Sequence, residues 1–199
     1  MTAYTVLATP SWGGTISFKA LLQPDVVGPA VATGSSASLA LSAGQVERLT
    51  FNANAGDSIE LELLGLATIP AGQSVTVQVY SPTVGQAITS STTAYASLTT
   101  ASAQALNLAN LPLSGTYTVI VTPTYGLPAN AQLDVTAEVV VPSTGTFQSL
   151  AANGSGENVY MTFSATQNQN LELTLNNVSV VGGSQNQFSV VVYLSLIHI

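Results

Sequence analysis

The sequence contains no cysteine, one histidine and only two basic residues, Lys19 and Arg48. The lack of cysteine excludes disulfide bonds, thiolate catalysis and cysteine-ligated metals. Two cations are too few to build a phosphate-binding surface, so we expect no nucleic-acid partner. Apolar runs are also short: none approaches the roughly 18–20 residues that a membrane-spanning helix needs, so we expect no membrane span.

Charge is scarce as well. Charged residues make up 6% of the chain, whereas ordinary globular domains carry about a quarter. The hydrophobic content of 46% nevertheless favours a folded chain over a disordered one. This lysine-poor, Ser/Thr/Gly-rich composition is typical of bacterial secreted and surface repeats. We therefore expect an extracellular or cell-surface location, although no signal peptide precedes the first strand.

Alternating apolar and polar residues predict six β-strands. They are RLTFNA (48–53), SIELELL (58–64), SVTVQVY (74–80), QALNL (104–108), TYTVIVT (116–122) and QLDVTAEVV (132–140). Turn-forming stretches separate them: NAGD (54–57), PAGQ (70–73), LSGT (113–116) and LPAN (127–130). No segment sustains a helical period. The pattern predicts an all-β, antiparallel sandwich of the jelly-roll or immunoglobulin-like kind.

Three phrases of the sequence occur twice. AYTVLATPSWG at 3–13 returns 113 positions later as TYTVIVTPTYG at 116–126. RLTFNANAGDSIELEL at 48–63 resembles YMTFSATQNQNLELTL at 160–175, and SVTVQVY at 74–80 resembles FSVVVY at 188–193. Similarity this long and in register predicts tandem sandwich repeats of about 113 residues, a usual size for one such domain.

The repeat divides the chain into four parts. Residues 1–27 correspond to the end of a preceding repeat, 28–141 to a complete repeat and 142–193 to the beginning of the next. The incomplete pieces should leave apolar faces and strand edges open, or pack on each other or on the middle unit. Residues 194–199, LSLIHI, match the translation of a sequencing adapter. We interpret them as an artefact, the alternative being a genuine apolar strand end.

Three stretches, GQVERLTFNANAGDSIELELLGL, SVTVQVYSP and LPLSGTYTVIVTP, resemble the bacterial pre-peptidase C-terminal-like β-sandwich repeats. The likeness is greatest to the tandem versions in large secreted or surface proteins, including those that carry RHS/YD repeats. It includes Gly44-Gln45 before the strand with Phe51, the Gly56-Asp57 turn, and Gly115 to Thr118 in a closing strand. The resemblance implies a noncatalytic accessory or spacer module without a cofactor.

The sequence offers little for catalysis. A Ser-His-Asp triad needs a histidine as base, and the one histidine, His198, lies in the adapter-like end. Glu60 and Glu62 could lie roughly 7 Å apart on one strand face, a spacing used in glycoside hydrolysis. The alternative is the solvated face of a half-buried strand, and it is favoured because Thr174 replaces Glu62 in the next copy. We expect no catalytic residue and no enzyme.

Two further groups have alternative interpretations. Asn52, Asn54 and Asp57 around a glycine turn could ligate Ca²⁺; ordinary turn chemistry is favoured because the next copy lacks the charge, so we expect no metal site. Trp12 and Tyr125 follow Thr-Pro at equivalent positions and could stack on sugars, or could pack over a strand end.

Aromatic, proline and glycine residues recur at equivalent positions and predict structural roles. Tyr117 should bury its ring and bond its hydroxyl to backbone, as in a tyrosine corner. The predicted structural residues are Tyr4, Tyr117, Phe51, Phe163, Pro10, Pro123, Gly13 and Gly126.

Two functions remain open. The first is a noncatalytic spacer or adhesive repeat whose partners are neighbouring repeats of the same chain, and possible further partners are a surface glycan or protein. The second is a carbohydrate-binding accessory module of a secreted hydrolase.

Overall fold

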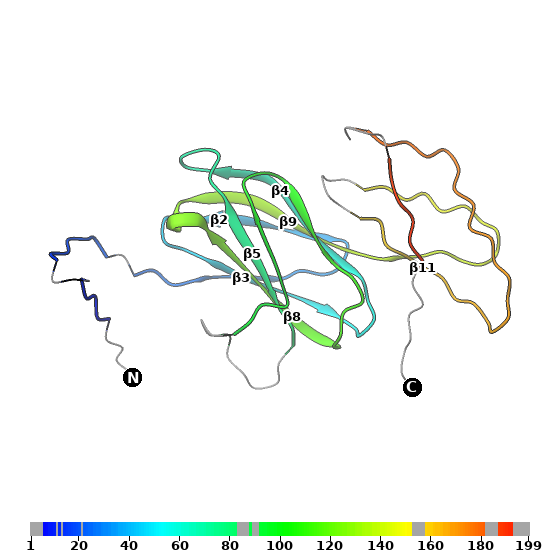
Figure 1. Cartoon of the computed structure of the whole chain (residues 1–199), viewed down its shortest axis with the longest axis horizontal. Coiled ribbons are helices and arrows are strands. Elements are labelled where there is room, and N and C mark those ends of the chain that lie inside the picture. The colour runs from blue at the N-terminus through cyan, green and yellow to red at the C-terminus, as the bar shows by residue number, and fades with distance from the viewer. Residues whose placement is uncertain are drawn as a thin grey trace.

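The computed structural model describes residues 6–10, 12, 14–20, 22–82, 88, 92–152, 158–181 and 187–192. In the described part of the stretch from Val26 to Ala137, nine strands form two packed sheets (Figure 1). One sheet has the order β1-β3-β8-β5-β6 and the other the order β2-β9-β4-β7. The prediction of an all-β sandwich is confirmed. No described segment forms a helix whose length and hydropathy would suffice to cross a bilayer.

Each of the six predicted stretches contains a strand. The strands are β3 (Glu47–Ala53), β4 (Ile59–Thr68), β5 (Val75–Tyr80), β7 (Gln104–Leu108), β8 (Gly115–Pro123) and β9 (Ala129–Ala137). Three strands were not predicted: β1 (Val26–Ala30), β2 (Ser35–Leu41) and β6 (Ala96–Thr100). VVGPA contains glycine and proline, and SSASLAL and ASLTT consist mostly of small residues, so the alternation of large apolar and polar side chains is weak in all three.

The core lies between the sheets and follows the period-two alternation of the strands. Its most deeply buried side chains, each at most 2% exposed, include Leu49, Phe51, Ile59, Leu61, Leu63, Val75, Val77, Val79, Tyr117, Val119, Val121, Leu133 and Val135. Burying one such side chain is worth about 1.5–3 kcal/mol. A one-residue slip of any strand would turn its apolar set outward, so this burial fixes the register.

The pairing departs from the antiparallel prediction at the first strand. β1 pairs with β3 in parallel, with Val26 opposite Glu47 and Val27 opposite Arg48, whereas the other pairs of the two sheets are antiparallel. The cause is the path of the chain. After β1 the chain crosses to the other sheet and reverses its direction in β2. It then crosses back to the first sheet, so that β3 runs in the same direction as β1.

The chain enters and leaves the sandwich at opposite ends. Val26 lies beside Glu47, which in turn pairs with Val121 near the end of β8; we call this the entry end. β9 starts at the entry end and runs nine residues to Ala137, which pairs with Ile59 at the exit end. In Figure 1 the described N-terminal and C-terminal segments accordingly lie on opposite sides of the sandwich along its longest axis.

The flanking segments hold little regular structure. In the described residues before Val26 there is no strand, and after Ala137 two short strands, β10 (Val139–Val140) and β11 (Met161–Thr162), pair in parallel. Many apolar side chains here are exposed, among them Val6, Phe18, Leu22, Phe163, Leu173 and Val190. The described residues of both flanking segments therefore expose apolar side chains.

Candidate functional site

The two aromatic residues proposed for ligand stacking share one backbone conformation. Trp12 has φ 59° and Tyr125 has φ 57°, a left-handed value uncommon for an aromatic residue. Their side chains are 102% and 88% exposed, respectively. The alternative that these rings pack over a strand end is therefore wrong for both. Each ring projects into solvent at the turn that follows a Thr-Pro pair.

The turn that carries Tyr125 is firmly anchored at the entry end. It is a single turn, η2 (Thr124–Gly126), directly after β8, in which Tyr125 has the left-handed dihedrals φ 57° and ψ 17°. The Thr124 N–H donates to the Ser74 carbonyl at 2.9 Å, and the Gly44 N–H donates to the Gly126 carbonyl at 2.7 Å. Gly126 has φ +62°, so a residue with a side chain would be strained there. The sandwich therefore presents the Tyr125 ring from a fixed backbone.

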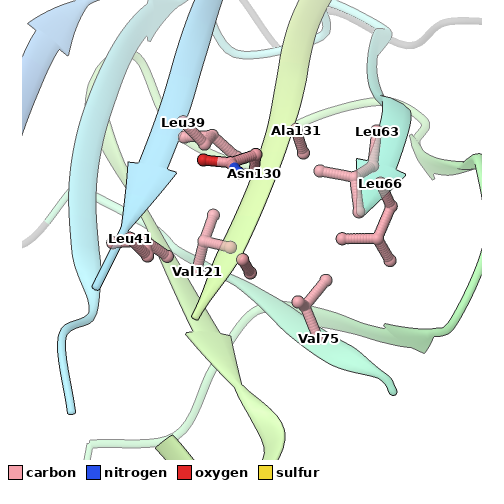
Figure 2. Close-up of a pocket in the computed structure, with 9 residues that line it drawn as sticks. Leu39, Leu41, Leu63, Leu66, Val75, Val121, Asn130 and Ala131 are labelled. Atoms are coloured by element: carbon pink, nitrogen blue, oxygen red, sulfur yellow. The ribbon is translucent and has the colours of Figure 1, made fainter. Parts of the chain in front are cut away.

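At the entry end the described side chains near this ring pack closely together. Side chains from both sheets, including Leu41, Leu66, Val75 and Val121, converge there (Figure 2). The space between them has no room for a water-sized molecule. A ligand of Tyr125 would therefore have to lie on the open surface, as a sugar stacked on an aromatic face does.

Glu60 and Glu62 are not solvated, contrary to the prediction. Their side chains are 2% and 3% exposed, and at Glu60 the chain after Ala137 covers the outer side of β4. The Asn158 N–H donates to Glu60 Oε1 at 3.1 Å and to Asn107 Oδ1 at 3.2 Å. A cavity of about 300 Å³ lies beside this contact, lined by Glu60, Thr136, Ala137, Val139, residues 149–151 and residues 158–160. Carboxylates buried in this way are poorly placed to attack a polysaccharide.

The glycine turn at 54–57 uses its polar side chains internally. Asp57 Oδ2 accepts from the Asn54 N–H at 2.7 Å and from Asn54 Nδ2 at 3.3 Å, and Asn52 Oδ1 accepts from the Thr116 hydroxyl at 2.7 Å. The described residues hold no group of three or more acidic, histidine or cysteine side chains placed to bind a metal. The structure favours turn chemistry over a calcium site.

The stretch at 166–169, which the sequence similarity pairs with 54–57, has the same turn geometry with different residues. The Gln169 N–H donates to the Thr166 carbonyl at 3.0 Å, and the Thr166 N–H donates to Gln169 Oε1 at 2.9 Å. Asn168, with φ 66°, takes the place of Gly56, with φ 94°. The substitution of QNQN for AGDS thus preserves the turn, because asparagine tolerates the left-handed conformation and glutamine caps it.

Tyr117 forms the predicted tyrosine corner. Its side chain is 0% exposed, and its hydroxyl donates to the Leu113 carbonyl at 2.8 Å. The ring stacks on Phe51 with centroids 5.2 Å apart, and the Tyr95 ring meets it edge-on at 6.4 Å. Burial raises the pKa of the hydroxyl. Pro123 ends the same strand, as predicted.

Several predicted residues lie elsewhere. Phe163, the counterpart of Phe51, is 42% exposed and so is not a core residue of the described fold. Pro10 lies in the described segment before the sandwich, outside any strand. Tyr4, Gly13 and the adapter-like residues 194–199 with His198 lie outside the described residues.

The structure also identifies a buried carboxyl that was not predicted. Glu47 is 3% exposed and lies on the core side of β3, in the same alternation as Leu49 and Phe51. Burial raises its pKa, and no partner for Oε2 exists among the described residues. Gly28 faces it closely: a Cβ there would come within 2.7 Å of Glu47 Oε1. The alternation of β3 places residue 47 on its inward face, so the burial of this carboxyl could have been predicted from the sequence.

Glu47→Gln should stabilise the fold at neutral pH. The folded-state pKa of Glu47 lies above its ordinary value of 4.5, so ionisation opposes folding as the pH rises through that value. We expect the variant to melt at a higher temperature than the parent at pH 7 and at nearly the same temperature at pH 3.5. Thermal melts across that range test this, with the exposed Glu172→Gln as control. A pH-independent difference would contradict the assignment.

Comparison with known proteins finds likeness at the level of structure alone. No protein-family description matches the sequence, and no curated protein matches it. PliG of Aeromonas hydrophila, a periplasmic inhibitor of g-type lysozyme, aligns over 56% of this chain and 99% of its own, with 18% identity and a TM-score of 0.40. The pre-peptidase C-terminal domain of a Bacillus anthracis collagenase aligns over 58% of this chain and 99% of its own, with 15% identity and a TM-score of 0.41. The fold class is therefore assigned from the two packed sheets of this chain and not from these comparisons.

Proposed function

We propose that the chain is a noncatalytic spacer built of tandem β-sandwich repeats in a large secreted or cell-surface bacterial protein. The observation that carries this proposal is the placement of entry and exit at opposite ends of the sandwich. Repeats joined in this way are stacked end to end, so each added unit lengthens the molecule. A sandwich with both connections at one end would instead fold its neighbours alongside it.

The start of a second unit after Ala137 supports the repeat. The Val26 N–H donates to the Val46 carbonyl at 2.8 Å, and the N–H of Val139, 113 residues after Val26, donates to the Tyr160 carbonyl at 2.9 Å. The second acceptor lies two residues beyond the position that the offset between 48–63 and 160–175 would give. Each bond begins a parallel pair, β1 with β3 and β10 with β11. These strands favour junctions just before Val26 and Val139, slightly earlier than the boundaries 27/28 and 141/142 expected from the sequence.

The joint between units has specific contacts. The Asn158 backbone, in the segment that follows the sandwich, bonds to Glu60 and Asn107 on the outer side of the four-stranded sheet. A hydrogen bond to a buried carboxylate is stronger than one between neutral groups. Such a contact orients the next unit on its predecessor and favours a stiff rod over a freely jointed chain.

Scattering from a lengthened chain tests the spacer function. Residues 28–141 would be duplicated in place after Val141, which leaves both junction sequences intact. β8 is nine residues long, or about 30 Å, so an end-to-end unit with its turns should increase the maximum dimension by about 35–40 Å. The unmodified chain is the reference. An increase below about 20 Å would show side-by-side packing and reject the rod.

Carbohydrate binding is the second candidate function. Trp12 and Tyr125 are displayed in the same conformation, both exposed, at equivalent positions of successive repeats. As an accessory module of a secreted hydrolase, the chain would use these rings as a regularly spaced stacking surface. A glycan array tests this with the parent, Trp12→Ala, Tyr125→Ala and the exposed control Phe147→Ala. Loss of binding in the first two variants supports it, and no glycan bound by the parent rejects it.

A further inference from the structure

β1 covers a buried carboxyl at the entry end of the sandwich. Val26 of β1 lies opposite Glu47, the first residue of β3, and the Glu47 side chain is 3% exposed. Gly28 lies directly against it: a Cβ there would come within 2.7 Å of Glu47 Oε1 and 2.8 Å of Leu49 Cδ2. No water fits between the Gly28 backbone and the carboxyl, so removal of β1 would expose the carboxyl to solvent.

Neither basic residue of the chain neutralises this carboxyl. Arg48 alternates with Glu47 on β3, and its Nε lies 2.8 Å from Asp25 Oδ2 on the solvent side. Lys19 is exposed in the segment before the sandwich. Glu47 Oε2 has no hydrogen-bond partner among the described residues. A negative charge on Glu47 would therefore be buried without compensation, which is strongly unfavourable.

The other ionisable groups of the neighbouring elements lie away from the carboxyl. β1 and β2 contain none. On β8, Val121 is the residue opposite Glu47, and Tyr117 stands four residues further along the strand. Further ionisable residues face the outer side of the four-stranded sheet or the solvent: Glu60 and Glu62 on β4, Asp134 on β9 and Tyr125 on η2.

β1 is held by few contacts, so it can detach while the rest of the sandwich stays folded. It is an edge strand five residues long and pairs with β3 alone. At its two ends the Val26 N–H donates to the Val46 carbonyl at 2.8 Å and the Val31 N–H to the Thr50 carbonyl at 2.7 Å. Between them the register is irregular, and Pro29 has no N–H to donate. Segments with so few buried contacts open at a lower free energy than the whole fold.

We propose that β1 is a pH-sensitive cover: it lies on β3 while the Glu47 carboxyl is neutral and detaches when that carboxyl ionises. Burial under β1 raises the pKa of Glu47 above its ordinary value of 4.5, to which the pKa returns when the carboxyl reaches water. Between these two pKa values the covered state binds more protons than the detached state. The equilibrium constant for detachment therefore rises by up to about tenfold per pH unit in this interval and levels off above it.

Detachment of β1 would loosen the joint with the preceding unit. β1 is the first strand after that connection, so its release adds up to five residues to the connecting segment. A rod of such units would be stiffer at acid pH than at neutral pH. This consequence rests on the proposed function, whereas the detachment itself does not.

Hydrogen exchange at single amides of the full chain, followed by NMR between pH 4 and pH 7.5, tests this inference. The Val26 and Val31 amides report the detachment of β1, after correction for the intrinsic effect of pH on exchange. Their protection should fall as the pH rises, by up to about tenfold per pH unit. The Gly44 amide, which donates to the Gly126 carbonyl at the same end, should keep its protection.

Two variants separate the titration of Glu47 from a general weakening of β1. Glu47→Gln cannot ionise, so the protection of both amides should no longer depend on pH and should stay at or above the highest level of the parent. Asp25→Asn removes the ion pair with Arg48 and should lower protection by the same factor at every pH.

Three results would each overturn the proposal: protection of β1 that does not depend on pH in the parent, a pH dependence that persists in Glu47→Gln, or an equal loss at Gly44, which would mean that the whole sandwich opens. The rod length measured by scattering after duplication is independent of all three, so a failure of the spacer function and a failure of this inference are distinguishable.

Discussion

Replacing Tyr117 by alanine is expected to lower the free energy of unfolding by about 3–5 kcal/mol, the usual cost of deleting a buried aromatic ring. The side chain is 0% exposed and stacks on Phe51. Because domains are stable by about 5–15 kcal/mol in total, this variant should be close to unfolding. Tyr117→Phe should cost about 1 kcal/mol, since it loses the bond to the Leu113 carbonyl but keeps the ring.

Urea denaturation measures both variants, with Tyr125→Ala as a control. Tyr125 is 88% exposed, so its removal should change the free energy of unfolding by no more than about 0.5 kcal/mol. Equal costs for Tyr117→Phe and Tyr117→Ala would mean that the hydroxyl bond, not the ring, dominates. No cost for either would contradict the tyrosine corner.

Phe51→Ala is the second large expected effect, again about 3–5 kcal/mol. Phe163 stands at the position that the sequence similarity pairs with Phe51, but its side chain is 42% exposed, against 1% for Phe51. Phe163→Ala should therefore change the free energy of unfolding by less than about 1 kcal/mol.

The pair of variants isolates the effect of burial, because the residue type and the local sequence are nearly the same. Chemical denaturation followed by the fluorescence of the chain measures both. A cost for Phe163→Ala as large as that for Phe51→Ala would show that the segment after Ala137 already closes a core within one molecule. That result would contradict the open faces of this segment.

The sequence predicts the strands whose apolar and polar residues alternate strongly. In β4 and β5, alternate apolar side chains bury one face, and a single window of sequence contains that signal. β1 and β2 escape prediction because Ser, Ala, Gly and Pro give them little propensity. Their strand form depends on partners distant in sequence, such as β9 opposite β2, and tertiary pairing here overrides local preference.

The candidate site was less predictable for the same reason. The sequence similarity pairs Trp12 with Tyr125, yet the left-handed φ of both residues, whose side chains are exposed, could not be predicted from it. Glu60 was assigned to a solvated face because its neighbours in sequence alternate, but a backbone group 98 positions away covers it. Burial by a distant segment cannot be inferred from a local period.

A distance across the sandwich tests the central claim, that the chain enters and leaves at opposite ends. The sequence has no cysteine, so Pro24→Cys with Val140→Cys provides two unique sites for spin labels, both at exposed positions. Given the length of β9, pulsed electron resonance should give a distance of roughly 30–45 Å between the labels. A distance below about 20 Å would place both connections at one end and contradict the end-to-end spacer.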